Sequence, residues 1–161
     1  MAKIPFHFVR IAFYRYVMSF KIGSGSSIHL GVKFNSRKFF EMGNNSTINQ
    51  DCRIDNRGGI IIGNNVSISP NVKLITADHD LSSTNFKGRE GIIQLDDYVF
   101  IGTDAIVLKN IRMHYGSALS AKSLLTRTTK HYGIYAGIPA KWVKNRPEGL
   151  DYNCSYLRWF Y

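Results

Sequence analysis

Large apolar residues recur at every sixth position along most of the chain. They run in three groups of three from position 22 to position 74, and after an interruption they continue from position 95 to position 125. A second column of mostly small residues follows them by four positions, from Ser26 to Thr129, and is broken only at Lys38 and Asp78. The fifteen apolar positions are Ile22, Ile28, Phe34, Met42, Ile48, Ile54, Ile62, Ile68, Leu74, Leu95, Ile101, Val107, Met113, Leu119 and Leu125.

This period matches neither the 3.6-residue turn of an α-helix nor the two-residue alternation of a long strand. It fits a strand of two or three residues followed by a tight bend. Three such sides close a coil of about eighteen residues, and stacked coils form a solenoid. Gly23, Gly43, Gly63 and the pairs Asn44-Asn45 and Asn64-Asn65 suit bends that need unusual backbone angles. The alternative is an antiparallel β-sandwich, whose strands would alternate over longer runs.

The repeat divides a single domain, residues 1–161, into three parts. Residues 1–20 are aromatic and basic and predict a short helix that caps the first coil, because the end of a solenoid has to be covered. A helix lying on an anionic membrane is the alternative for this segment. Residues 21–130 form the coils, interrupted by a polar loop at 75–94 that is too long for a corner. Residues 131–161 form a C-terminal turn and an aromatic tail.

Five motifs resemble those of the hexapeptide-repeat acyltransferases, and the strongest is the Gly-x-Pro-Ala-Lys run that begins at Gly137. The similarity is greatest to galactoside, maltose and serine acetyltransferases and to O-acetyltransferases of bacterial exopolysaccharide biosynthesis. It implies an all-β fold, a left-handed parallel β-helix, although the general rule for parallel crossovers favours the opposite hand. The matching segments are Ile48–Asp55, Ser69–His79, Asp97–Thr103, Leu119–Arg127 and Gly137–Lys144.

The resemblance makes His79 the catalytic residue. Transfer of an acyl group from a thioester to a hydroxyl needs a general base, and an imidazole suits that task at neutral pH. Asp78, Asp80 or a backbone carbonyl would fix its tautomer. Asn49 lies in a motif whose asparagine belongs to the acceptor site of the family, where an amide holds the acceptor or stabilises an oxyanion; a turn asparagine is the alternative. Cys52, in the same motif, is interpreted as a core residue.

The resemblance also implies a donor site for acetyl-CoA between neighbouring β-helices of a homotrimer. Positively charged side chains would bind the phosphates of the nucleotide through charge-assisted hydrogen bonds. Lys122 and His114 stand where the family usually has glycine, and Lys122 would either contact phosphate or crowd the groove. The predicted donor-site residues are Phe100, Gly102, Thr103, Ala121, Lys122, Thr126, Arg127, Lys141, Lys144 and Arg146.

Composition and net charge limit the kinds of molecule that the chain is expected to bind. Of the 161 residues, 44% are hydrophobic, and Lys+Arg number 21 against 11 Asp+Glu, a formal net charge of +10. The chain is therefore globular, not disordered. The positive charge suits nucleic acid, an anionic membrane or a polyanionic ligand, and nucleic acid is disfavoured because no dense basic cluster or binding motif is present. Cys52 and Cys154 offer neither a disulfide framework nor a metal-ligand spacing, so we expect no metal.

The sequence therefore predicts an acetyl-CoA-dependent O-acetyltransferase that acts on a sugar hydroxyl in surface polysaccharide biosynthesis, by direct transfer with His79 as the base. One alternative is an N-acetyltransferase that acts on an amino sugar, and the other is a β-helix that has lost its chemistry. No apolar run reaches the length of a membrane span, and the start lacks the features of a secretory signal. We expect a cytoplasmic protein, with association at the inner face of the membrane as a less favoured alternative.

Overall fold

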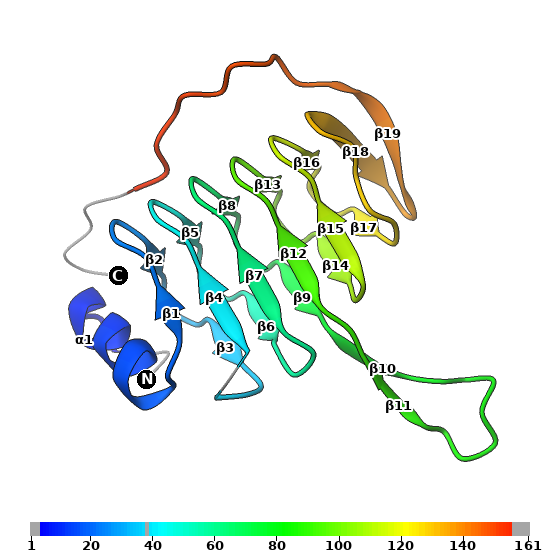
Figure 1. The fold of residues 1–161 in the computed structure, drawn as a ribbon, viewed down its shortest axis with the longest axis horizontal. Coiled ribbons are helices and arrows are strands. Elements are labelled where there is room, and N and C mark those ends of the chain that lie inside the picture. Colours follow the sequence, from blue (N-terminus) through cyan, green and yellow to red (C-terminus); the bar gives the residue numbers. More distant parts are fainter. Residues whose placement is uncertain (1–3, 38, 156–161) are drawn as a thin grey trace.

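The computed structural model describes residues 4–37 and 39–155, which wind into a parallel β-helix (Figure 1). Successive short strands belong in turn to three sheets, so the coils form a three-sided prism. The first sheet holds β1 (Lys21–Ile22), β4 (Phe40–Met42), β7 (Ile60–Ile62), β12 (Ile93–Leu95) and β15 (Ile111–Met113). The second holds β2 (Ser27–Ile28), β5 (Thr47–Ile48), β8 (Ser67–Ile68), β13 (Phe100–Ile101), β16 (Ala118–Leu119), β18 (Gly133–Gly137) and β19 (Ala140–Asn145). The third holds β3 (Lys33–Phe34), β6 (Arg53–Asp55), β9 (Lys73–Ile75), β14 (Ile106–Leu108) and β17 (Leu124–Leu125).

The six-residue period is confirmed in the interior of the prism. Ile48, Ile68, Ile101 and Leu119 stand in register on neighbouring strands of the second sheet, and each has a relative exposure of 0%. Of the fifteen predicted positions, only Ile22 and Phe34 in the first coil are partly exposed, and both pack against the core. Each six-residue repeat thus contributes one large side chain to a continuous apolar column inside the prism. Burial of this column is the main stabilising contribution in a solenoid.

Three rows of corners join the sheets, and we name them the first corner (first to second sheet), the second corner (second to third) and the third corner (third to first). The pairing of Lys21 with Glu41 gives the first coil twenty residues, whereas Ile93 pairs with Ile111 in a coil of eighteen. The two extra residues lie at the third corner, between β3 and β4. Extra chain at this corner becomes a full hairpin in the third coil.

The glycines of the first corner serve a purpose other than the predicted one. Gly23, Gly43 and Gly63 were expected to supply unusual backbone angles, but none of them has a positive φ. A Cβ on Gly43 would lie 2.7 Å from the carbonyl carbon of Gly63, so these positions have no room for a side chain. The positive φ belongs to Gly25, at 68°, in the first of these bends and to Asn45 and Asn65, both at 53°, in the next two, so the prediction holds for the asparagine pairs.

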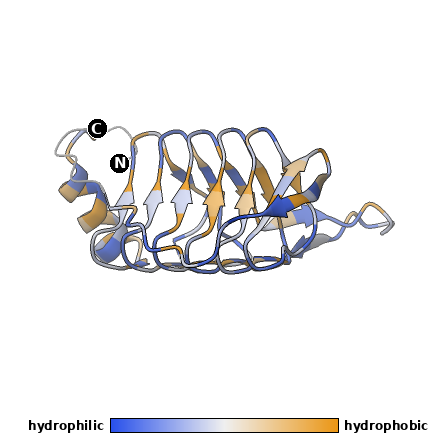
Figure 2. Cartoon of the chain, turned by 90° about the horizontal axis from the view of Figure 1, so that it is seen from above, coloured by the Kyte–Doolittle hydropathy of each residue, from blue (hydrophilic) through white to orange (hydrophobic). Residues whose placement is uncertain are grey.

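The N-terminal segment caps the first coil, as predicted. Helix α1 (His7–Ala12) and a π-helical turn, η1 (Phe13–Val17), lie at this end of the prism (Figure 2). The ring of Tyr14 stacks on Phe20 at 6.0 Å between centroids, and Phe20 packs on Phe34 at 4.9 Å. The buried guanidinium of Arg10 donates hydrogen bonds to the carbonyls of Ile28 and Ile4.

The C-terminal part closes the opposite end and then returns along the molecule. Strand β19 pairs antiparallel with β18 and extends the second sheet. The chain then runs back along the prism (Figure 1), where the hydroxyl of Thr47 donates to the carbonyl of Cys154 at 2.8 Å. The aromatic tail at 156–161 lies outside the described residues. Within the described part of the chain, no helix is long and apolar enough to cross a membrane.

Candidate active site

The polar interruption at 75–94 forms an antiparallel hairpin that projects from the third corner (Figure 1). Its strands are β10 (Ala77–His79) and β11 (Gly88–Glu90). Nε and Nη2 of Arg89 lie 3.0 and 3.2 Å from the two carboxylate oxygens of Asp78, and Nζ of Lys109 lies 3.1 Å from Asp78 Oδ2. The hydrogen bond from Arg89 is the largest cause that lowers the pKa of Asp78 below its usual value. The ionised carboxylate therefore ties the hairpin to the following coil.

His79 is oriented by the hairpin itself. Its Nδ1 lies 2.8 Å from the carbonyl oxygen of Phe86, and its ring stacks on Phe86 with centroids 4.2 Å apart at an angle of 8°. A carbonyl only accepts hydrogen bonds, so Nδ1 carries the proton and Nε2 has the lone pair that a general base needs. Of the three orienting groups predicted, the structure contains the backbone carbonyl. No feature of the sequence marked Phe86 for this role.

The two neighbouring carboxylates have other contacts. Asp78 is engaged with Arg89 and Lys109, as described above. Asp80 Oδ1 accepts a hydrogen bond from the amide of Ser82 at 3.0 Å and lies 3.5 Å from Nη1 of Arg89. Both carboxylates thus shape and fasten the hairpin, and His79 sits on a scaffold that their ion pairs hold in place.

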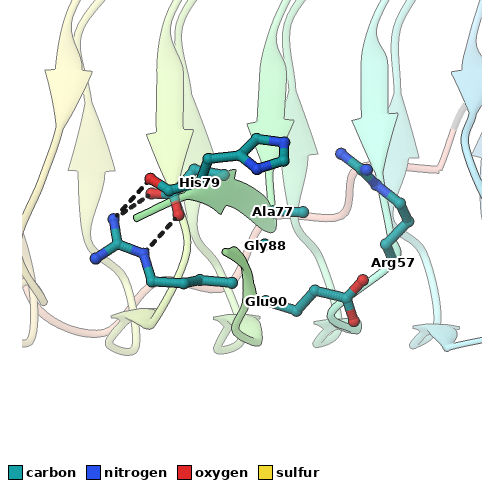
Figure 3. A pocket seen from close by; sticks show the side chains of 7 residues that line it. Arg57, Ala77, His79, Gly88 and Glu90 are labelled. Atoms are coloured by element: carbon teal, nitrogen blue, oxygen red, sulfur yellow. Dashed lines mark hydrogen bonds and ion pairs between the residues drawn. The ribbon is translucent and has the colours of Figure 1, made fainter. Parts of the chain in front are cut away.

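A cavity of about 400 Å³ opens beside His79, at the base of the hairpin. This size is within the usual range of small-molecule sites. Figure 3 shows the imidazole of His79 and the guanidinium of Arg57 on the same side of the hairpin strands. Arg57 binds the buried carboxylate of Asp55 through two hydrogen bonds of 2.8 and 2.9 Å, and this bonding is the main cause that lowers the pKa of Asp55. No sequence motif marks Arg57 as a site residue.

Asn49 lies away from His79 within one chain. It follows β5 at the second corner, whereas the hairpin leaves the third corner after β9. Its Nδ2 donates to the carbonyl of Ile68 at 2.9 Å. The predicted base and the predicted acceptor amide are therefore on different edges of the prism.

Several predicted donor residues gather along the second corner, in the same row as Asn49. Phe100 is 38% exposed on β13. A Cβ on Gly102 would lie 2.5 Å from the amide of Ala121, so only glycine fits there. The amide of Gly102 donates to the carbonyl of Leu119 at 2.8 Å. Of these two neighbouring backbone amides, the amide of Thr103 is therefore the candidate donor to a ligand.

Lys122 is accommodated in the same row. Its φ is 56°, and its amide donates to the carbonyl of Thr103 at 2.8 Å. It takes the position that Asp104 (φ 60°) and Asn71 (φ 62°) occupy in earlier coils, which explains why glycine suits this place. The residue is exposed, and a lysine here lies beside the predicted groove. His114, the other departure, stacks on His131 at 4.8 Å between ring centroids.

The predicted phosphate ligands fall into two sets. Thr126 and Arg127 follow β17 at the third corner, and Lys141 and Lys144 lie on β19 at the edge of the second sheet; all four are exposed. No Asp or Glu occurs in the sequence between Asp104 and Glu148. Lys109 and Arg112 pair with Asp78 and Asp96, and the exposed Lys and Arg side chains that remain give the last coils positive charge suited to phosphate groups. The Lys and Arg residues of this stretch are Lys109, Arg112, Lys122, Arg127, Lys130, Lys141, Lys144 and Arg146.

Arg146 differs from the other predicted phosphate ligands. Its Nη1 donates to the carbonyls of Tyr98 and Gly116 at 3.0 and 3.1 Å, and its Nη2 lies 3.2 Å from the hydroxyl of Tyr152. It directly follows β19 and is partly buried at the first corner. These contacts fasten the returning C-terminal segment to the coils.

Cys52 is a core residue, as predicted. Its thiol is buried and lies 3.2 Å from the carbonyl of Ser69, and burial raises its pKa to about 12. Among the described residues, no group of three or more His, Cys, Asp and Glu side chains could hold a metal ion.

The raised pKa of Cys52 makes its reactivity testable. The thiol stays protonated until the pH approaches 12, and only the thiolate is nucleophilic. We expect Cys52 to remain unmodified by Ellman's reagent at about pH 8 in the folded protein and to react once guanidinium unfolds it. Peptide mass spectrometry checks this outcome, with Cys154, whose pKa burial also raises, as an internal comparison. Rapid labelling of Cys52 in the folded protein would contradict the assignment.

Comparison with known proteins gives short sequence matches and extensive structural ones. No protein-family model matches the chain. A chloramphenicol acetyltransferase from Klebsiella aerogenes is 38% identical over 48 residues, which are 30% of this chain and 23% of that enzyme. One from Morganella morganii is 33% identical over 58 residues, 36% of this chain and 28% of that enzyme. The chain therefore matches about a quarter of the length of these curated relatives.

Among solved structures, a hexapeptide-repeat acetyltransferase from Vibrio cholerae superposes with a TM-score of 0.81 at 21% identity, covering 86% of this chain and 80% of that one. A galactoside acetyltransferase in complex with coenzyme A has a TM-score of 0.79 at 21% identity, covering 89% and 76%. A variant of an N-acyltransferase from Bacillus cereus, in complex with dTDP and coenzyme A, has a TM-score of 0.67 at 18% identity, covering 91% and 92%. The predicted likeness to the hexapeptide-repeat fold is thus confirmed.

Proposed function

Starting from a fold shared with hexapeptide-repeat acetyltransferases, we infer that this chain is an acetyl-CoA-dependent O-acetyltransferase that acts on a sugar hydroxyl. The observation that carries this proposal is the orientation of His79, whose Nδ1 donates to the carbonyl of Phe86 and whose Nε2 is left to accept a proton beside a cavity of about 400 Å³. A merely structural histidine has no need of a fixed tautomer facing a pocket. The cationic last coils supply the complementary surface for the donor.

The chemistry requires a single direct transfer. The acceptor hydroxyl loses its proton to Nε2 of His79 as its oxygen attacks the thioester carbonyl. The amide of Thr103 or the side chain of Asn49 stabilises the oxyanion of the tetrahedral intermediate. Collapse of the intermediate breaks the carbon–sulfur bond, and the leaving thiolate of coenzyme A takes the proton back from the imidazolium. No acyl-enzyme is formed, since the buried, protonated Cys52 is not a nucleophile.

The working enzyme is a homotrimer with its sites between subunits. The hairpin that carries His79 projects away from its own prism (Figure 1), and the row containing Asn49 and Thr103 lies on another edge. Base and donor groove meet when the hairpin of one subunit reaches the second corner of its neighbour. The exposed Ile138 and Trp142, at 73% and 53%, flank that corner at the C-terminal end and offer apolar contact area. We place the enzyme in the cytoplasm, in the synthesis of a surface polysaccharide.

A second candidate is transfer to the amine of an amino sugar, which the likeness to the N-acyltransferase from Bacillus cereus favours. The same base and donor site serve both reactions, because an attacking amine also has to lose a proton. The product separates them, since an ester is cleaved by mild alkali or hydroxylamine and an amide is not.

Incubation with radiolabelled acetyl-CoA and a panel of galactosides, maltose and amino sugars tests the proposed function. We expect one acceptor to gain label in an alkali-labile ester, with release of one coenzyme A for each acetyl group transferred. An alkali-stable product would select the N-acetyltransferase instead. Retention of label on the protein, with none on any acceptor, would contradict direct transfer.

The donor site gives a separate prediction. Replacing Lys141 with alanine removes one charge-assisted hydrogen bond to phosphate, so the KM for acetyl-CoA should rise about tenfold with little change in kcat. Lys21→Ala is the matched control, because Lys21 is an exposed lysine on the first sheet, in the first coil at the opposite end of the prism. Steady-state kinetics with varied acetyl-CoA measures both variants, and an equal effect of the two would remove Lys141 from the donor site.

A further inference from the structure

The N-terminal end of the prism carries positive charge that the proposed reaction does not use. The first acidic residue of the sequence is Glu41, and seven lysines and arginines precede it. The cationic stretch between Asp104 and Glu148 matches the phosphates of the donor, but it belongs to the last coils, at the opposite end of the molecule (Figure 1). These residues are Lys3, Arg10, Arg15, Lys21, Lys33, Arg37 and Lys38. Lys3 and Lys38 lie outside the described residues, and Arg10 is buried.

The cap at this end has a buried face and an exposed aromatic face. Ile11 and Tyr14 face the first coil and are at most 9% exposed. Phe8, Tyr16 and Val17, from the same two helical turns, are 68%, 82% and 51% exposed. The capping role therefore accounts for half of this amphipathic segment and leaves its other large side chains in water, where a soluble helix usually carries polar residues.

The first coil, next to the cap, adds cations and a further exposed aromatic residue. Phe39, at the third corner of the first coil, is 64% exposed. Arg15, Lys33 and Arg37 are exposed as well. The guanidinium of Arg15 donates to the carbonyls of Ile22 and Gly23 while its charge stays at the surface. Exposed aromatic rings and exposed cations thus share one end of the molecule.

We propose that this end of the β-helix docks on an anionic lipid bilayer. Aromatic rings gain free energy by entering the interfacial region of a membrane, and nearby Lys and Arg are attracted to the negative headgroups. Neither contribution alone gives stable binding, and this surface supplies both. Glu41 of the second coil pairs with Lys21 at 2.6 Å, and the exposed Arg15, Lys33 and Arg37 add further positive charge at this end, which attracts anionic headgroups.

The geometry keeps the candidate active site open in this orientation. The hairpin with His79 leaves the third coil, two coils from the cap, which is about 10 Å along the prism at the usual spacing of strands. It projects away from the capped end of the prism (Figures 1 and 2), so its cavity stays in solution when the cap meets the bilayer. The surface is thus a docking face separate from the site.

Co-sedimentation with vesicles tests this proposal on the full chain. The vesicles are phosphatidylcholine alone and phosphatidylcholine mixed with phosphatidylglycerol. We expect binding to the mixed vesicles only, and weaker binding as the salt concentration rises. The double variant Phe8→Ala/Tyr16→Ala should bind at least about tenfold more weakly, and Lys33→Ala/Arg37→Ala about tenfold more weakly. Leu81→Ala and Lys73→Ala, at exposed positions elsewhere, are the matched controls.

Two checks make the result decisive. Thermal unfolding shows whether each variant keeps its fold, and these exposed positions should leave the melting temperature unchanged. Light scattering reports self-association through the same face. Failure of the unaltered chain to bind mixed vesicles overturns the proposal. So does full vesicle binding by Phe8→Ala/Tyr16→Ala, whether or not that variant loses self-association, because the aromatic face would then not be a membrane surface.

Discussion

His79→Ala lowers kcat about 100- to 10,000-fold, the range expected when a general base is removed. The reason is the fixed tautomer: Nδ1 donates to the carbonyl of Phe86 at 2.8 Å, so Nε2 is the one ring nitrogen able to take the proton of the acceptor. Binding of acetyl-CoA should change little, because the predicted donor residues lie on other elements of the chain. The measurement is steady-state kinetics with the acceptor found in the screen, together with a direct binding assay for acetyl-CoA.

The matched control is His131→Ala, which removes another exposed histidine outside the hairpin. We expect that variant to keep near-normal turnover. Full turnover by His79→Ala would contradict the proposed role of His79 as the general base. A loss of acetyl-CoA binding in His79→Ala equal to its loss of activity would show that the residue belongs to the donor site and is not the base.

Ile68→Ala should cost about 2–5 kcal/mol of unfolding free energy, as other large-to-small changes in packed cores do. Ile68 is 0% exposed and stands in register between Ile48 and Ile101. Coils above and below hold their own side chains in place, so the cavity cannot close by local collapse. Because each coil contacts only its neighbours, the weakened rung also reduces the coupling between the two halves of the solenoid.

Ile61→Ala is the control for this prediction. Ile61 is on β7 in an adjacent sheet, points outward and is 39% exposed. Its replacement should change stability by less than about 0.5 kcal/mol. Urea unfolding followed by circular dichroism measures both variants. Equal losses for Ile61→Ala and Ile68→Ala would mean that the interior column does not dominate stability.

The interior of this fold was predictable because each strand and the bend after it depend on only about six neighbouring residues. A large apolar residue at one position and a small one four residues later suffice to set a strand and a bend, and stacking repeats the same environment. The reason for Gly43 was not predictable in the same way. Its need for glycine comes from the backbone of Gly63 in the next coil, a contact that exists only after the coils have stacked.

The contacts of the candidate site were less predictable than the fold. The motif around His79 predicts a base at that position, whereas the carbonyl of Phe86 as its hydrogen-bond partner depends on how the hairpin turns back. The sequence grouped Arg146 with the phosphate ligands, whereas the returning C-terminal segment surrounds it with carbonyls and Tyr152. Arg57 lines the cavity because the second coil, to which it belongs, stacks on the third coil, which carries the hairpin. A contact between coils of this kind leaves no local sequence pattern.

Calorimetric titration of acetyl-CoA into the purified protein tests the central claim most directly, with desulfo-coenzyme A and ATP as comparison ligands. We expect saturable binding of acetyl-CoA at a single site per chain, with lower affinity in Lys141→Ala and unchanged affinity in Lys21→Ala. A folded protein that takes up no acetyl-CoA at millimolar concentration would contradict the account and favour a β-helix without this chemistry.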